Sequence, residues 1–231
     1  EQNHVTRCIC TNGGKTMLTD MGTILRQAKK EGYGVAAPNA WSLNTVKSIF
    51  EAASELKAPV IIDGAGIHQI EEISDAVHFY EKKFPEVTAA LNLDHGGAFE
   101  EIIQAIRCGY TSVMVDRSTL TFEENVREVA EIVKIAHAVG VSVEAELGHV
   151  GQGFEYEQTR DSGLTRKEEA IDFVKQTNVD ALAVSVGTSH GTYHGTPKLE
   201  FELLADLHQM VEVPLVLHGG SLSGSRFLAS S

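Results

Sequence analysis

The sequence predicts an α/β protein, and more closely a (β/α)₈ TIM barrel whose eighth strand and C-terminal helices we expect this chain to lack. Two observations favour this fold. Short apolar segments alternate with amphipathic segments, a pattern typical of right-handed βαβ crossovers and a parallel sheet. Polar residues and glycines directly follow the apolar segments, and the sites of such barrels collect at the carboxyl ends of the strands. An open doubly wound sheet is the alternative, but no Gly-x-Gly-x-x-Gly motif follows the first predicted strand.

The elements of the barrel domain, expected over residues 17–221, follow from two kinds of pattern. Apolar residues three or four apart predict helices, and uninterrupted apolar runs of about five residues predict buried strands. The predicted strands cover residues 34–39, 59–63, 87–93, 112–116, 142–146, 180–186 and 215–217. The predicted helices cover residues 21–31, 42–57, 71–84, 98–108, 122–139 and 201–210, and another begins at a capping box over 165–168. We expect an N-terminal extension over 1–16 and an atypical serine-rich tail over 222–231 to flank the domain.

Local signals support several of these boundaries. Gly32 ends the first helix, because glycine readily takes the left-handed conformation found after a helix. Ser42 begins the second helix as its N-cap. A polar, glycine-rich segment over 147–163 follows the fifth predicted strand. Its length exceeds that of a typical connection, which favours a mobile functional loop.

The composition fits one domain and argues against several kinds of partner. The chain has 231 residues, of which 42% are hydrophobic, and this suffices for one sizeable core. Its net charge of −13 argues against nucleic acid and anionic membranes as partners. No apolar run approaches the roughly 20 residues that a membrane span needs, and the first residues do not resemble a signal peptide. The three cysteines do not make a disulfide framework, so we expect a cytoplasmic protein.

Three histidines each follow an apolar strand directly, and a glycine follows each of them. They are His95, His190 and His218. Because parallel strands end at the same rim of a barrel, we expect the three imidazoles to lie near one another. Three neutral imidazoles that leave a fourth position open make a Zn²⁺ Lewis-acid site. The alternative is that they are scattered structural histidines.

Carboxylates accompany these histidines along the chain. Asp94 precedes His95, so we expect the two side chains to diverge, which suits a general acid or base beside a metal. A helix-capping or supporting carboxylate is the alternative for Asp94. Glu144 and Glu146 face the same side of one strand and could support the site or bind a second cation. Asp116 also ends a strand, and the same alternatives apply to it.

Small residues beside the histidines could bind a phosphate through backbone N–H and hydroxyl groups. They are Gly191, Gly219, Gly220 and Ser221. Turn geometry alone is the alternative explanation for each glycine.

Together these motifs resemble those of the class II, metal-dependent ketose-bisphosphate aldolases, the fructose- and tagatose-bisphosphate aldolase family. The matching stretches, in one-letter code, are LDHG over 93–96, SVMVD over 112–116, EAELG over 144–148, GTSHG over 187–191 and LHGGS over 217–221. They span most of the predicted barrel domain and are specific in combination.

The resemblance implies roles for particular residues. The implied ligands of a catalytic zinc ion are His95, His190 and His218. Asp94 would move the proton of the aldehyde-derived hydroxyl. A second divalent or a monovalent cation would be held at Asp116 and Glu146. The implied contacts to the phosphorylated sugar substrate are Asn39, Gly191, Gly219, Gly220 and Ser221.

Two stretches depart from the family pattern. The family usually follows Glu-Leu-Gly with a segment whose acid exchanges the proton of the enediolate, whereas residues 149–156 here read HVGQGFEY. Glu155 is the candidate for that acid, and His149 is a further titratable candidate. The family also continues past His-Gly-Gly-Ser to a last strand with a phosphate loop, which residues 222–231 do not resemble.

The expected activity is reversible cleavage of a ketose 1,6-bisphosphate into dihydroxyacetone phosphate and an aldehyde phosphate. Fructose and tagatose bisphosphate remain equal candidates, because they differ only in configuration at C4. The resemblance suggests a homodimer or homotetramer. An inactive or assembly-supporting relative is the alternative from another functional class. A zinc hydrolase on the same barrel is the enzymatic alternative, but it more often places paired histidines on the first strand.

Overall fold

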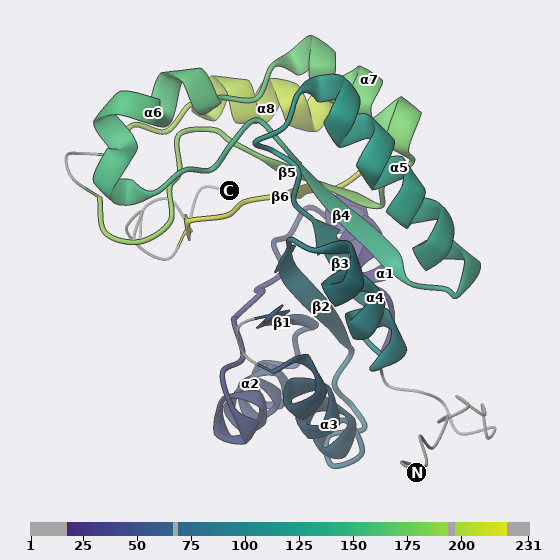
Figure 1. Ribbon diagram of the computed structural model, residues 1–231. Helices are drawn as coiled ribbons and strands as arrows, with labels where there is room; N and C mark the ends of the chain where they lie inside the picture. Colours follow the sequence, from purple (N-terminus) through teal and green to yellow (C-terminus); the bar gives the residue numbers. More distant parts are fainter. Residues whose placement is uncertain (1–17, 67–68, 194–196, 221–231) are drawn as a thin grey trace.

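The computed structural model describes residues 18–66, 69–193 and 197–220. The expected extension over 1–16, Ser221 and the tail over 222–231 lie outside these residues. Within them, six parallel strands and the surrounding helices form an α/β fold that curls into part of a TIM barrel (Figure 1). This confirms the predicted fold class. None of the described helices combines the length and the apolar character that a membrane span requires.

The sheet follows the order of the chain, and each strand pairs in parallel with the next. Its strands are β1 (Val60–Ala65), β2 (Ala89–Gly96), β3 (Ser112–Val115), β4 (Ser142–Leu147), β5 (Ala181–Val184) and β6 (Leu215–Val216). A doubly wound sheet reverses its strand order at a switch point. The uninterrupted sequential order therefore supports the barrel and contradicts the doubly wound alternative.

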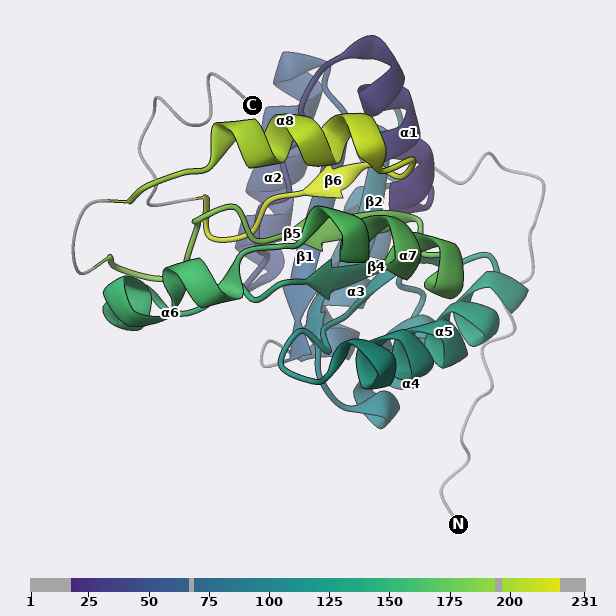
Figure 2. The same cartoon turned by 90° about the horizontal axis from the view of Figure 1, so that it is seen from above.

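Helices cover the outer face of the curled sheet, as the view from above shows (Figure 2). They are α2 (Leu43–Leu56), α3 (Ile70–Tyr80), α4 (Phe99–Arg107), α5 (Phe122–Ala138), α7 (Lys167–Thr177) and α8 (Phe201–Met210). Neighbouring helices pack against each other around the outside, among them α2 with α3 and α7 with α8. The apolar core lies between this helical layer and the sheet.

The first helix, α1 (Met21–Glu31), closes the amino end of the partial barrel. Its buried side chains pack against the inward-facing residues Ile61, Ala90 and Ala181. The Met21 N–H donates to Ser112 Oγ at 2.8 Å, and the Gly22 N–H donates to Ser142 Oγ at 3.3 Å. The first N–H groups of a helix have no partner within the helix. Serines of β3 and β4 therefore satisfy them inside the barrel.

The strands carry apolar side chains outward and polar side chains inward near their carboxyl ends. On β2, Leu91 and Leu93 pack into the core beneath the helices, whereas Asn92 between them faces the barrel interior. Glu144 and Glu146 alternate in the same way with Ala145 on β4. Successive side chains of a strand point to opposite faces. The carboxyl half of the interior is therefore polar, and this is where the candidate site lies.

The predicted strand over 34–39 does not form a continuous element. Ala36 and Asn39 make isolated parallel bridges to Val60 and Asp63, so the segment lies beside β1 in the position of a first strand. Pro38, between the two bridges, has no N–H to donate to a ladder. The segment therefore pairs with β1 at separate points.

The segment between β4 and β5 also differs from the prediction. Residues 147–163 contain a short 3₁₀ helix, η2 (Gly153–Glu155), and the helix α6 (Tyr156–Gly163). Tyr156 is buried, and its hydroxyl donates to the Gly187 carbonyl and accepts from the Lys198 N–H. This anchor comes from residues distant in the sequence, so the polar composition of the segment did not reveal it.

The predicted capping box over 165–168 does not form. Thr165 Oγ1 donates to the Leu147 carbonyl at 2.5 Å and accepts from the Ser185 N–H at 2.8 Å. The hydroxyl therefore joins the ends of β4 and β5. Helix α7 begins at Lys167 without a side-chain cap.

Candidate active site

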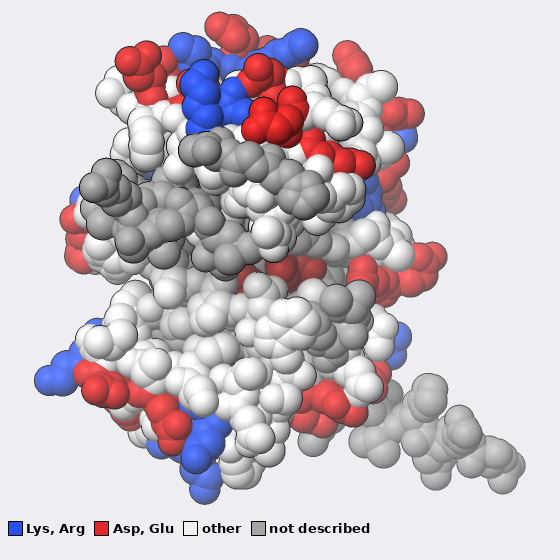
Figure 3. Space-filling model, turned by 90° about the vertical axis from the view of Figure 1, so that its left-hand side faces the viewer, with Lys and Arg blue, Asp and Glu red and all other residues white. Residues whose placement is uncertain are grey.

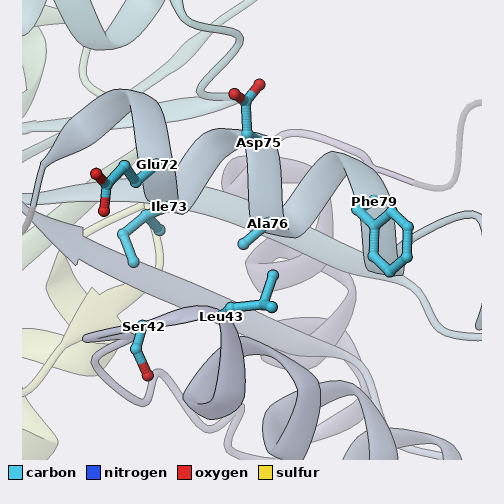
Figure 4. A pocket seen from close by; sticks show the side chains of 7 residues that line it. All are labelled: Ser42, Leu43, Glu72, Ile73, Asp75, Ala76 and Phe79. Carbon is cyan, nitrogen blue, oxygen red and sulfur yellow. The ribbon is translucent and has the colours of Figure 1, made fainter.

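The candidate site lies at the carboxyl end of the partial barrel, the side that faces the viewer in Figure 3, where acidic side chains are visible in a depression between the upper and lower parts. The predicted residues there come from β2, β4 and the segments after β3, β5 and β6. They are Asp94, His95, Asp116, Glu144, Glu146, His190 and His218. A surface pocket of about 410 Å³ lies elsewhere, between α2 and α3 (Figure 4). Leu43, Ile73 and Ala76 line it, and the structure places none of the predicted site residues there.

Asp94 and His95 both reach the site, although adjacent strand residues normally point to opposite faces. His95 has a φ of 51°, in the left-handed region, and the pairing of β2 with β3 shifts register between Leu93 and Gly96. This irregularity turns the imidazole inward, so that His95 Nε2 lies 3.7 Å from Asp94 Oδ1. The expectation that the two side chains diverge was wrong for this reason.

The three predicted histidines come together. The centroid of the His95 ring lies 4.9 Å from that of His190 and 4.6 Å from that of His218. One ligand atom from each ring lies within 4.8 Å of the others. Nε2 of His95 and Nε2 of His190 are buried and have no hydrogen-bond partner among the described residues. Unpartnered buried nitrogens that converge in this way fit the ligands of a metal ion.

Two carboxylates hold the other nitrogens of two of these rings. His95 Nδ1 lies 2.9 Å from Asp116 Oδ2, and His218 Nε2 lies 2.9 Å from Glu144 Oε1. Metal-binding histidines commonly donate their second nitrogen to a carboxylate, which fixes the ring and its tautomer. These pairs therefore leave His95 Nε2 and His218 Nδ1 as the nitrogens that could face a metal.

The protonation of the rings depends on these partners. Burial lowers the pKa of His218, but the hydrogen bond and charge of Glu144 outweigh it and raise that pKa to about 10. Burial, together with the neighbouring His95 and His218, lowers the pKa of His190 to about 4. Burial also lowers the pKa of His95, whereas its hydrogen bond with Asp116 produces a net rise. His190 is therefore neutral at pH 7, as a metal ligand must be.

Asp94 lies beside the three histidines and is held from the other side by Asn39. Asn39 Nδ2 donates to Asp94 Oδ2 at 2.7 Å. Asp94 Oδ1 is buried without a partner among the described residues, and it lies 3.9 Å from His218 Nδ1. This oxygen is therefore available to a group bound next to the histidines.

A second possible ligand group shares His95 with the first. His95, Asp116 and Glu146 also offer ligand atoms within 4.8 Å of one another. Glu146 Oε1 accepts from the Val150 N–H at 2.9 Å, whereas Oε2 is buried and unpartnered among the described residues. Burial and the charge of Asp116 raise the pKa of Glu146. A cation beside the two carboxylates would relieve this repulsion.

The predicted phosphate contacts lie next to His190 and His218. Gly191 and Gly219 have φ values of 73° and 70°, in the left-handed region that favours glycine. A Cβ at Gly219 would lie 2.5 Å from the Ser189 carbonyl oxygen, so the two segments touch through their backbones. Gly220 follows on the same segment. Ser221 lies outside the described residues.

Glu155 is not part of the histidine cluster. It lies exposed on η2, and its carboxylate makes no hydrogen bond or ion pair with the residues that the structure describes. The backbone before it is tied to the site, because the Gly153 N–H donates to the His190 carbonyl and the His190 N–H donates to the Gly151 carbonyl. The role of Glu155 stays a prediction.

Sequence reasoning missed two residues of the site interior. Asp63 of β1 and Asn92 of β2 are buried below the histidines, and Asn92 Nδ2 donates to Asp63 Oδ1 at 3.1 Å. Burial, with the charges of Asp94 and Glu144, raises the pKa of Asp63 well above its usual range. A polar residue within an otherwise apolar strand is the signal that could have identified both.

Comparison with known proteins identifies the family. A family model described as fructose-bisphosphate aldolase class-II matches residues 19–229. The chain belongs to this family. It is 42% identical over 214 residues to the fructose-bisphosphate aldolase of Helicobacter pylori (strain ATCC 700392 / 26695), which covers 89% of this chain and 69% of that relative. It is 43% identical over 205 residues to that of Thermus caldophilus, covering 86% of this chain and 67% of the relative.

A solved structure supports the same family. The crystal structure of the YdjI aldolase from Escherichia coli K12 is similar with a TM-score of 0.78 and 34% identity, covering 88% of this chain and 74% of that chain. The chain is thus a class II aldolase, a carbon–carbon lyase. Class II aldolases are generally metal-dependent, which agrees with the convergent histidines.

Proposed function

We propose that this class II aldolase is metal-dependent and reversibly cleaves a ketose 1,6-bisphosphate into dihydroxyacetone phosphate and an aldehyde phosphate. The observation that carries the proposal is the convergence of His95, His190 and His218 beside the unpartnered oxygen of Asp94. The three rings fit zinc best, because zinc prefers imidazole nitrogen in tetrahedral sites with an open position. Fructose and tagatose bisphosphate are both candidate substrates.

A zinc ion held by the three histidines would supply a Lewis acid for the ketone oxygen of the substrate. Asp94 would take the proton from the C4 hydroxyl as the C3–C4 bond breaks, so that C4 becomes the aldehyde and the electron pair stays on the C3 side. Asn39 would hold the Asp94 carboxylate in place through its hydrogen bond. In the reverse direction, the same carboxylate would return the proton to the new hydroxyl.

The remaining site residues would bind the substrate and complete the proton transfers. Gly191, Gly219, Gly220 and Ser221 would bind the phosphate of the dihydroxyacetone half, because glycine lets backbone N–H groups approach an anion. Glu155 would deliver the proton that C3 takes up after cleavage. Asp116 and Glu146 would hold a second or alternative cation. We also propose a cytoplasmic homodimer or homotetramer.

Metal content and cleavage, measured on the same sample, test this function. The chain should bind about one zinc ion in the three-histidine site and cleave a ketose bisphosphate, and a chelator should abolish cleavage. Asp94→Ala should lose cleavage by a factor of about 10²–10⁴ while it keeps its zinc, since general acid–base catalysis contributes about that much. Loss of zinc together with cleavage would show that Asp94 supports the metal site instead. Side-by-side assays with fructose and tagatose bisphosphate identify the substrate.

A further inference from the structure

We propose that Ser118 is a positioning residue of the metal centre, which orients His95 through Asp116 and joins His149 to the same chain of hydrogen bonds. The proposal rests on the metal site of the proposed function. Ser118 follows β3, and His149 lies in the segment after β4. The series of hydrogen bonds therefore joins two segments at the carboxyl ends of neighbouring strands.

Both oxygens of the Asp116 carboxylate have a partner. The Ser118 N–H and the Ser118 hydroxyl reach Oδ1 at 3.1 and 2.8 Å, and His95 Nδ1 lies 2.9 Å from Oδ2. Two contacts on one oxygen and one on the other fix the rotation of the carboxylate about its own axis. The carboxylate in turn fixes the plane of the His95 ring. Without the Ser118 hydroxyl, Asp116 keeps its contact with His95, but one of the hydrogen bonds that fix the orientation of its carboxylate is lost.

The donors and acceptors in this chain can be assigned. An ionised carboxylate only accepts hydrogen bonds, so Oδ1 of Asp116 accepts from both the Ser118 N–H and the Ser118 hydroxyl. The single proton of the hydroxyl is therefore used in this bond. Ser118 Oγ lies 2.9 Å from His149 Nδ1 and must therefore accept a proton from that nitrogen. Glu146 Oε1, an acceptor, lies 3.7 Å from the same nitrogen and agrees with this assignment.

These hydrogen bonds connect the segment after β4 to His95, the proposed metal ligand on β2. His149 follows Gly148, whose φ is 77°, and the His149 N–H donates to the Gly163 carbonyl at the end of α6. The backbone of His149 is thus held against the C-terminal end of α6, and its ring contacts Ser118.

The test measures metal affinity and not only activity. Partners of metal ligands change metal affinity by about 10- to 100-fold when they are removed. Because Ser118 acts through Asp116, we expect Ser118→Ala to weaken zinc and cobalt binding by about tenfold, at the lower end of that range. The visible spectrum of the cobalt-loaded protein should change, since it reports the ligand geometry. Ser118→Thr keeps the hydroxyl and should restore both. Ser162→Ala, which removes an exposed hydroxyl on α6, is the matched control.

Two substitutions of His149 test the assigned donor. Asn can place its amide N–H where Nδ1 lies, whereas Gln places it where Nε2 lies. His149→Asn should therefore keep the wild-type metal affinity, and His149→Gln should lower it by less than the loss for Ser118→Ala, because His149 is one hydrogen bond further from the metal. Thermal unfolding of each metal-free variant separates a local effect from a general loss of stability. If Ser118→Ala lowers the unfolding temperature, the comparison of His149→Asn with His149→Gln tests the proposal instead. These two substitutions change a half-exposed ring and should leave the fold intact.

Unchanged metal affinity and an unchanged cobalt spectrum in Ser118→Ala would overturn the proposal while the metal site itself stands. A wild-type chain that binds no metal would overturn this proposal and the proposed function together. A wild-type protein that binds metal without cleaving a sugar bisphosphate would contradict the proposed function alone. The metal affinities of the wild type and of Ser118→Ala would still test the role of Ser118.

Discussion

Replacing Glu144 by Gln tests how the protein holds the His218 ring. Glu144 Oε1 lies 2.9 Å from His218 Nε2, and both side chains are largely buried. Glu144 raises the pKa of His218 to about 10 against the opposing effect of burial. In the metal-free protein at neutral pH, His218 therefore carries a proton that a bound metal must displace.

The size of the effect follows from this proton. Below the pKa of His218, the apparent association constant for a metal rises about tenfold for each pH unit, because the His218 ring must lose one proton for each ion bound. Between about pH 7.5 and 9.5, wild-type affinity should rise about 100-fold. In Glu144→Gln, the amide carbonyl still accepts the hydrogen bond, but no negative charge stabilises the imidazolium. The pKa of His218 then returns toward its usual range, and affinity stays nearly constant over the same interval.

The substitution should leave the fold intact. Gln has nearly the shape of Glu, and the contact that becomes unfavourable, between its NH₂ group and Asn92 Nδ2, is a long one, so Asn92 can keep its hydrogen bond to Asp63. Asn92 Nδ2 lies 3.5 Å from Glu144 Oε2, and Asn92 Oδ1 is buried without a partner among the described residues. Glu51→Gln makes the same chemical change at an exposed position of α2 and serves as the control.

Competition with a chelator of known affinity gives the association constant at each pH. Calorimetry in two buffers of different ionisation enthalpy counts the released protons independently. A wild-type affinity that does not change with pH, or a full pH dependence retained by Glu144→Gln, would refute the reasoning.

Three further predictions follow from the same geometry. His218→Ala should remove the bound metal, and an unchanged metal stoichiometry would contradict the three-histidine site. Gly219→Ala should destabilise the protein by about 1–3 kcal/mol in urea unfolding, because a Cβ at φ 70° would lie 2.5 Å from the Ser189 carbonyl oxygen; wild-type stability would show that this backbone can shift. The stability of the metal-free protein should be greatest near neutral pH. The contribution of His190, whose folded pKa is about 4, is lost as pH falls below the unfolded value of about 6.5. The contribution of His218 is complete below about 6.5 and is lost as pH rises toward 10. Thermal unfolding across this range measures both slopes, and stability that rises steadily into alkaline pH would contradict the second.

The sequence by itself determined the barrel and most of the members of the site. Alternating apolar segments required parallel strands, and parallel strands deliver whatever follows them to one rim. This is why His95, His190 and His218 could be grouped without knowing any contact. The two-residue spacing of Glu144 and Glu146 placed both inside the barrel, because side chains alternate along a strand.

Only the tertiary structure decided which group each side chain holds. The left-handed backbone at His95 depends on the register of β2 against β3, so the prediction that His95 and Asp94 diverge failed. Glu144 and Asp116 each select one histidine through a side-chain contact between strands, and such contacts leave no trace in local composition. The anchor of Tyr156 that stabilises α6 is of the same kind. Periodicity predicts which segments become strands, whereas the direction of a side chain beyond a strand is fixed by neighbours that are distant in sequence.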